Sequence, residues 1–96
     1  MVHETPNVLA FRDINPKAPV HILIIPKPHI DTVMDVQPDQ ESLLAEMTQV
    51  VQKVARSEKA EAGFRLVVNN GREAGMAVSH LHIHLLAGRP LKWPPG

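Results

Sequence analysis

The segment Ser79-His80-Leu81-His82-Ile83-His84-Leu85-Leu86-Ala87-Gly88 carries three of the chain's six histidines at alternate positions. Successive side chains of a β-strand point to opposite faces, so this spacing predicts a strand with all three imidazoles on one face and the apolar residues on the other. An α-helix would turn each residue by about 100° and scatter them. The strand is expected to end at Gly88. It would gather several near-neutral proton carriers, nucleophiles or metal ligands in a small area.

Composition limits the class of protein. Ninety-six residues allow one domain with a modest core, here residues 1–96. A net charge of +0 argues against a nucleic-acid footprint, although a small nucleotide needs only a local pocket. The chain has no cysteine, which excludes disulfides and thiolate sites. No apolar run approaches the roughly 20 residues of a membrane span, and residues 1–6 lack a signal-peptide pattern. A cytoplasmic protein with no membrane or nucleic-acid partner is expected.

The remaining patterns predict an α+β fold. Strands are expected over residues 2–4, 8–14, 20–25 and 64–69, and a helical turn over 32–34. Pro38–Asp39 opens one long helix, with Asp39 as N-cap and Gly63 closing the helical region. Its apolar stripe consists of Leu43, Leu44, Met47, Val50, Val51 and Val54. The order of elements indicates a mainly antiparallel sheet of about five strands with one main helix.

Two kinds of chemistry suit the histidine cluster. Histidines two apart on a strand can both bind zinc, but Glu73 is the only acidic residue close to them in sequence. The second is nucleophilic catalysis, because a neutral imidazole attacks phosphorus and the resulting phospho-imidazole is readily hydrolysed. The loop from Gly71 to Gly75 precedes the strand and could offer backbone amides to a phosphate. A solvent-facing strand with inert histidines is the bland alternative.

Residues 80–86 also fit a known signature, His-φ-His-φ-His-φ-φ, in which φ is apolar. The chain resembles the histidine-triad nucleotide-binding (HINT) branch of the histidine-triad (HIT) family in four further segments. These are residues 9–16 (LAFRDINP), 24–30 (IIPKPHI), 64–69 (FRLVVN) and 93–96 (WPPG). The Trp-Pro-Pro-Gly ending is especially characteristic, and the resemblance covers almost all of the chain.

That resemblance implies a hydrolase for purine nucleoside monophosphoramidates that works through a nucleotidyl-histidine intermediate. It also implies a HIT-like homodimer whose two sheets join into one larger continuous sheet, with no cofactor and no metal. His82 matches the nucleophile, His80 and His84 match its supporting members, and His29 matches the family's fourth histidine. The implied substrate-binding residues are Asp13 for the ribose hydroxyls, Phe11 and Ile14 for the base and ribose pocket, Asn69 and Ala77 near the phosphate, and Trp93 toward the partner's site.

The sequence departs from the family pattern at two places, and the first bears on whether the protein is catalytic. The family usually reads Gly-Gln-Ser-Val before the triad, where this chain has Gly75-Met76-Ala77-Val78, so two phosphate-binding side chains are missing. Slower turnover is therefore expected, and a non-catalytic nucleotide-binding dimer is the competing hypothesis. The N-terminal helix typical of the family is also largely absent from this sequence.

Taken without the family, the matched positions have ordinary explanations. Phe11 and Ile14 would be core residues, Asp13 and Asn69 turn residues, and His29 a surface histidine. The unmatched His21 is also expected on the surface. The resemblance favours a functional role at the matched positions but adds nothing for His21 or His3.

Overall fold

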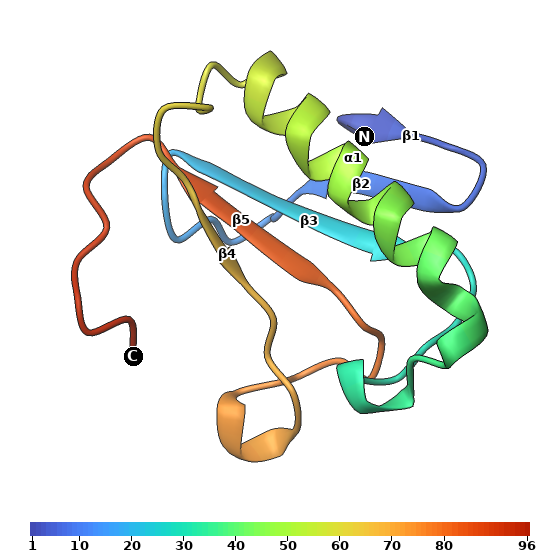
Figure 1. Ribbon diagram of the computed structural model, residues 1–96. Coiled ribbons are helices and arrows are strands. Elements are labelled where there is room, and N and C mark those ends of the chain that lie inside the picture. Colours follow the sequence, from blue (N-terminus) through green and yellow to red (C-terminus); the bar gives the residue numbers. More distant parts are fainter.

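A five-stranded antiparallel sheet and one long helix form the two layers of the computed structural model, which describes residues 1–96 (Figure 1). The strands lie in the order β1-β2-β3-β5-β4, and the α+β prediction is confirmed. Their bounds are β1 His3–Glu4, β2 Val8–Arg12, β3 Val20–Pro26, β4 Arg65–Val67 and β5 Ile83–Ala87. The helices are α1 Glu41–Ser57 and the 3₁₀ turns η1 Val33–Asp35, η2 Pro38–Gln40 and η3 Arg72–Ala74. None of them combines the length and apolar character that a membrane span requires.

The core lies between α1 and one face of the sheet. Alternate residues of the central strands point toward the helix, among them Ile22, Ile24 and Leu85, each 0% exposed. The helix contributes most of its predicted stripe, with Met47 and Val50 almost fully buried. Leu44 is the exception at 41% exposure, and it lines an apolar cavity together with Val68 and Ile83. Burial of this apolar layer fixes which face each strand residue takes.

The opposite face of the sheet carries no helix and is where the histidines lie. Cross-strand partners share a face, and β3 pairs with β5 so that Leu23 lies opposite His84 and His21 opposite Leu86. Gly88 ends β5 at a φ of 94°, as expected, and a Cβ there would stand 2.8 Å from Pro19 Cβ. The sheet is thus covered on one side and open on the other, and we call the uncovered side the open face.

The histidine strand is shorter than predicted at its start. Only His84 belongs to β5, whereas His80 and His82 precede it in extended chain outside the ladder. The cause is the end of β3 at Pro26, which has no N–H to continue the pairing. The amide of Leu81 donates instead to the carbonyl of Ile30, 2.6 Å away. Alternation survives this change, since Leu81 is buried and the flanking histidines are half-buried.

Both predicted ends of the long helix were wrong. Asp39 lies in η2, one turn before α1, and the N-cap of α1 is Gln40, which makes no side-chain cap. The helix ends at Ser57 rather than near Gly63, and Lys59 takes a left-handed φ of 57° just beyond it. The predicted turn at 32–34 is η1, one residue later, and is capped by the Thr32 side chain.

Candidate active site

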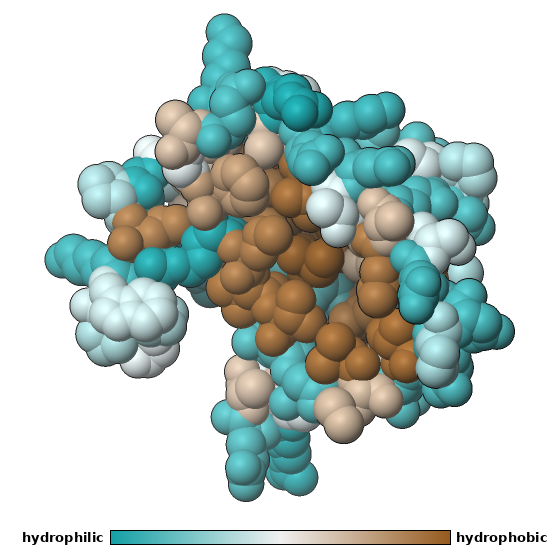
Figure 2. All heavy atoms as spheres, in the orientation of Figure 1, coloured by the Kyte–Doolittle hydropathy of each residue, from teal (hydrophilic) through white to brown (hydrophobic).

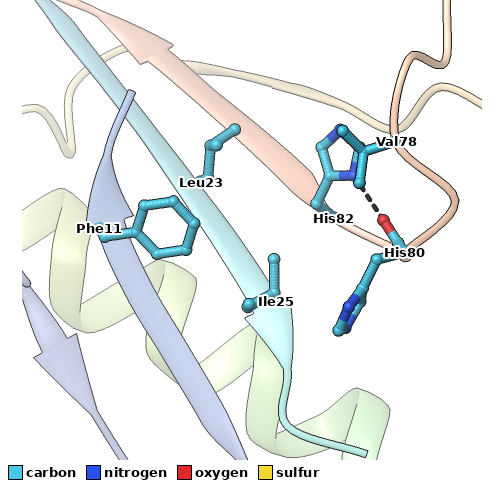
Figure 3. A pocket seen from close by; sticks show the side chains of 6 residues that line it. All are labelled: Phe11, Leu23, Ile25, Val78, His80 and His82. Carbon is cyan, nitrogen blue, oxygen red and sulfur yellow. Dashed lines mark hydrogen bonds between the residues drawn. The ribbon is translucent and has the colours of Figure 1, made fainter. Parts of the chain in front are cut away.

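The hydrogen bond of His82 leaves one ring nitrogen free. Its Nδ1 lies 2.6 Å from the backbone carbonyl of His80, and a carbonyl can only accept. The proton of the neutral ring is therefore on Nδ1, and the lone pair is on Nε2. Figure 3 shows this bond as the dashed line, with the His82 ring standing beside the cavity. A nucleophilic histidine needs this arrangement.

His80 links the segment before β5 to the end of β3. Its Nε2 donates to the carbonyl of Pro26 at 3.0 Å, which ties the segment before β5 to the end of β3. The ring of His29 packs edge-on against it with centroids 5.0 Å apart. His29 therefore lies near the triad as expected, but its own Nε2 bonds to Asp31 and its side chain is exposed. Together these contacts hold the backbone carbonyl that orients His82.

His84 is oriented by a histidine that the sequence interpretation placed on the surface. His21 is only 5% exposed, so that expectation was wrong. The Lys17 amide donates to Nδ1 of His21 at 3.0 Å, which leaves the proton of that ring on Nε2. The His21 Nε2 then donates to Nδ1 of His84 at 2.9 Å. It follows that neutral His84 carries its proton on Nε2 and can donate it on the side away from His21.

Burial keeps these two rings neutral. Desolvation lowers the pKa of His84 below the ordinary value of about 6.5, and the nearby His82 and His21 lower it further. Desolvation also lowers the pKa of His21, with Asp13 acting in the opposite direction. Both histidines are therefore uncharged at neutral pH, which is the state that the hydrogen-bond chain describes.

Asp13, His21 and His84 have been brought close enough to raise the question of a metal site. One ligand atom from each lies within 4.8 Å of the other two. The hydrogen bond from the Lys17 amide argues against a metal site. It makes Nδ1 of His21 an acceptor, so the proton of that ring is on Nε2. A metal would need the lone pair of this Nε2, which the proton occupies. Asp13, His21 and His84 therefore fit a chain of hydrogen bonds, which we call the relay, better than a metal site.

Two cavities flank the triad on the open face. The first, of about 310 Å³, is mainly apolar and has the lining residues Phe11, Leu23, Ile25, Val78, His80 and His82. In Figure 3 the side chains of β2 and β3 form one wall and the two histidines the other. The second, of about 180 Å³, has the lining residues Lys17, His21, Val67, Asn69, His84 and Leu86. A ligand group at His82 and His84 would thus have one cavity on each side.

The remaining predicted residues are only partly gathered here. Asp13 caps a turn by accepting the Asn15 amide at 2.8 Å, and its other oxygen is 3.5 Å from His21 Nε2. Ala77 is exposed, next to the Val78 that lines the first cavity. Ile14 is 92% exposed and Trp93 81% exposed, and neither lines a cavity of this chain.

His21 is the site residue that sequence reasoning missed. A usable pattern was present, since His21 alternates with Ile22 and Ile24 in the strand expected over residues 20–25. Its strand partners show that it shares the open face with His84. Pairing of those two strands could have placed His21 on the histidine face, although not at hydrogen-bond distance.

Comparisons with known proteins agree with this geometry. Residues 1–91 match the model of the HIT domain. An uncharacterized HIT-like protein of Chlamydia trachomatis is 52% identical over 87 residues, which are 91% of this chain and 78% of that protein. A HIT family hydrolase from Legionella pneumophila has a TM-score of 0.94 at 51% identity, over 99% of this chain and 86% of that one.

A more distant solved structure extends the comparison. The histidine triad nucleotide-binding protein from Candida albicans has a TM-score of 0.79 at 32% identity, over 96% of this chain and 71% of that chain. The family model spans nearly the whole sequence, and the similarity to these proteins runs through sequence and fold alike. The chain therefore belongs to the HIT domain family.

Proposed function

We propose that the protein is a hydrolase that cleaves the P–N bond of purine nucleoside 5′-monophosphoramidates through a nucleotidyl-histidine intermediate. The observation that carries the proposal is the free Nε2 of His82, fixed by the bond from its Nδ1 to the His80 carbonyl. The Legionella pneumophila structure described as a hydrolase supports the reaction type. The Candida albicans structure described as nucleotide-binding supports the ligand and the HINT branch of the family.

The proposed reaction has two displacements at phosphorus. His82 Nε2 attacks, a P–Nε2 bond forms, the P–N bond to the leaving amine breaks, and the amine takes up a proton from the solvent. A water molecule then attacks the same phosphorus and releases a proton to the solvent, the P–Nε2 bond breaks, and the nucleoside monophosphate leaves. The Nε2–H of His84 stabilises the charge on the phosphoryl oxygens during both steps. His82 returns to its starting tautomer.

The nucleoside is proposed to occupy the apolar cavity beside His82. Phe11, Leu23 and Ile25 offer an apolar wall for a purine, and Val78 closes the opposite side. Asp13 stands beside His21 and has one carboxylate oxygen with no shorter contact than 3.5 Å, so it can accept a ribose hydroxyl. Asn69 shares the second cavity with His84 and can donate to the phosphate.

The experiment that tests the function is hydrolysis of a fluorogenic adenosine 5′-phosphoramidate. The wild-type protein is expected to release adenosine monophosphate, and His82→Asn is expected to lose turnover while still binding the nucleotide. The matched control is His3→Asn, a histidine in β1 at the far edge of the sheet. Full turnover by the His82 variant would refute the assignment of His82 as the nucleophile.

A non-catalytic nucleotide-binding module is the second candidate. It is favoured by Met76 and Ala77, neither of which has a side-chain donor for a phosphate oxygen. Nucleotide binding without turnover across several phosphoramidates would decide for it.

A homodimer is proposed through β4, the edge strand nearest the C-terminal tail. Its outer edge has no partner strand, and an unpaired edge is a template for another chain. Figure 2 shows apolar side chains gathered beside α1 and β4. The exposed members from these elements and the segments adjoining them are Leu44 at 41%, Phe64 at 37%, Leu66 at 46% and Val68 at 42%. An apolar patch along an open edge suits a second copy of the chain.

A further inference from the structure

We propose that the Lys17 end of the open face binds a second anionic group of the substrate, in addition to the reacting phosphate. The proposal rests on the proposed function, because it concerns the same ligand. It names the substrate class more narrowly, as a nucleotide that carries a carboxylate or a further phosphate near its scissile bond.

Lys17 is held next to the triad by its backbone. Its amide donates to His21 at 3.0 Å, and its carbonyl accepts the Arg89 guanidinium at 2.9 Å. Lys17 is one of the residues that line the second cavity, together with His84 and Asn69. The ammonium group donates to the Asn15 carbonyl at 3.0 Å and is otherwise exposed. A lysine with a fixed backbone therefore lies in the same cavity wall as His84.

Unpaired cations gather at this end of the molecule. The four ion pairs of the protein involve Arg12, His21, Lys27 and His29, so Lys17, Arg65, Arg89 and Lys92 have no carboxylate partner. Arg65 and Arg89 line a neighbouring cavity of about 300 Å³ with no acidic residue in its wall.

Asp13 is the acidic residue at this end, and its negative charge offsets one of these cations. One of its oxygens accepts the Asn15 amide at 2.8 Å and the other faces His21 at 3.5 Å. Because Lys17, Arg65 and Arg89 together outnumber Asp13, a substrate held at His84 would meet a local excess of positive charge. A substrate could place a second anion in the second cavity in two ways. One is a carboxylate on the leaving amine, and the other is a phosphate on the ribose, whose hydroxyls are proposed to lie at Asp13.

The first arm of the test compares two adenosine 5′-phosphoramidates that differ only at the end of the leaving group. One amine carries a carboxylate and the other the neutral carboxamide. Wild-type kcat/KM is expected to favour the carboxylate about three- to tenfold, with the preference falling as salt rises. Lys17→Gln is expected to remove the preference and Lys17→Arg to keep it. Lys53→Gln, on the exposed side of α1, is the matched control and keeps it too.

The second arm needs no turnover. Calorimetry compares binding of adenosine monophosphate with adenosine 3′,5′-bisphosphate, and a tighter bisphosphate that loses its advantage in Lys17→Gln assigns the anion to the ribose. A preference in either arm that depends on Lys17 supports the subsite. Equal treatment of charged and neutral ligands in both arms, or a preference unchanged in Lys17→Gln, overturns it. Hydrolysis of the carboxamide substrate tests the function separately, so the two failures are distinguishable.

Discussion

His21 Nε2 lies 2.9 Å from Nδ1 of His84, on the same open face but on the neighbouring strand. Because the Lys17 amide holds the other nitrogen of His21 as an acceptor, the bond runs in one direction, from His21 to His84. The relay does not conduct a proton through His21, whose ring would be left anionic. It selects the tautomer in which His84 presents an N–H on the side away from His21.

Replacement of His21 by Phe is expected to lower kcat about 10- to 100-fold, with a smaller change in KM, because His84 loses the donor that selects its tautomer. Steady-state kinetics and ¹⁵N chemical shifts of the His84 ring measure the two effects. His3→Phe is the matched control, a half-buried histidine in β1. An unchanged His84 tautomer together with a lowered kcat would show that His21 acts by another route.

Substitution of Ala77 by Ser, alone or with Met76→Gln, is expected to raise turnover of the fluorogenic phosphoramidate. A hydroxyl at position 77 can donate to a phosphoryl oxygen as charge develops, and such a donor contributes up to about 10²–10³ in rate. Ala74→Ser in η3 adds the same hydroxyl elsewhere in the loop and is expected to have no effect. Unchanged or lower rates in both Ala77 variants would argue for another leaving-group contact.

Acidification is expected to destabilise the protein through His21 and His84. Burial lowers the pKa of both rings, so the unfolded chain binds protons more readily than the folded one. Stability is then full above the unfolded pKa of about 6.5 and is lost as the pH falls from there toward the lowered folded values. Urea unfolding at a series of pH values measures this slope. A double variant, His21→Phe with His84→Asn, is expected to flatten it, and an equally steep slope would point to other groups.

Substitution of Leu66 by Lys is expected to weaken the proposed dimer at least tenfold in sedimentation equilibrium, because a charge would enter the apolar edge at β4. The control is Gln52→Lys on the exposed side of α1. A wild-type protein that sediments as a monomer at all concentrations would contradict the dimer itself.

The alternation of the triad was readable from sequence because it depends on a local property, the period of two in extended chain. The length of the ladder was not, because it depends on where β3 stops. Pro26 ends that strand, and its effect reaches residues 80–82, more than 50 positions later. The helix ends were misplaced for a related reason, since η2 absorbs Asp39 and Lys59 takes the left-handed conformation expected of glycine.

The site residues also differ in whether their contacts are local or distant in sequence. His82 was identified by its place in the signature, and its backbone bond to His80 is local, two residues away. His21 required knowledge of a partner 63 residues away. A single buried histidine in an apolar strand looks like many others, and only the pairing of β3 with β5 shows what it contacts. The exposed positions Ile14 and Trp93 remain predictions that depend on a second chain or a bound ligand.

The bond that orients His82 ends on a main-chain oxygen of its own segment, and every residue type supplies that oxygen. Mutational drift in neighbouring side chains therefore cannot remove the partner, provided the backbone keeps its course. By contrast, the proposed ligand contacts at positions 17 and 69 depend on side-chain chemistry and can change one at a time. A fold built this way can acquire new substrates while the proposed attacking group stays the same.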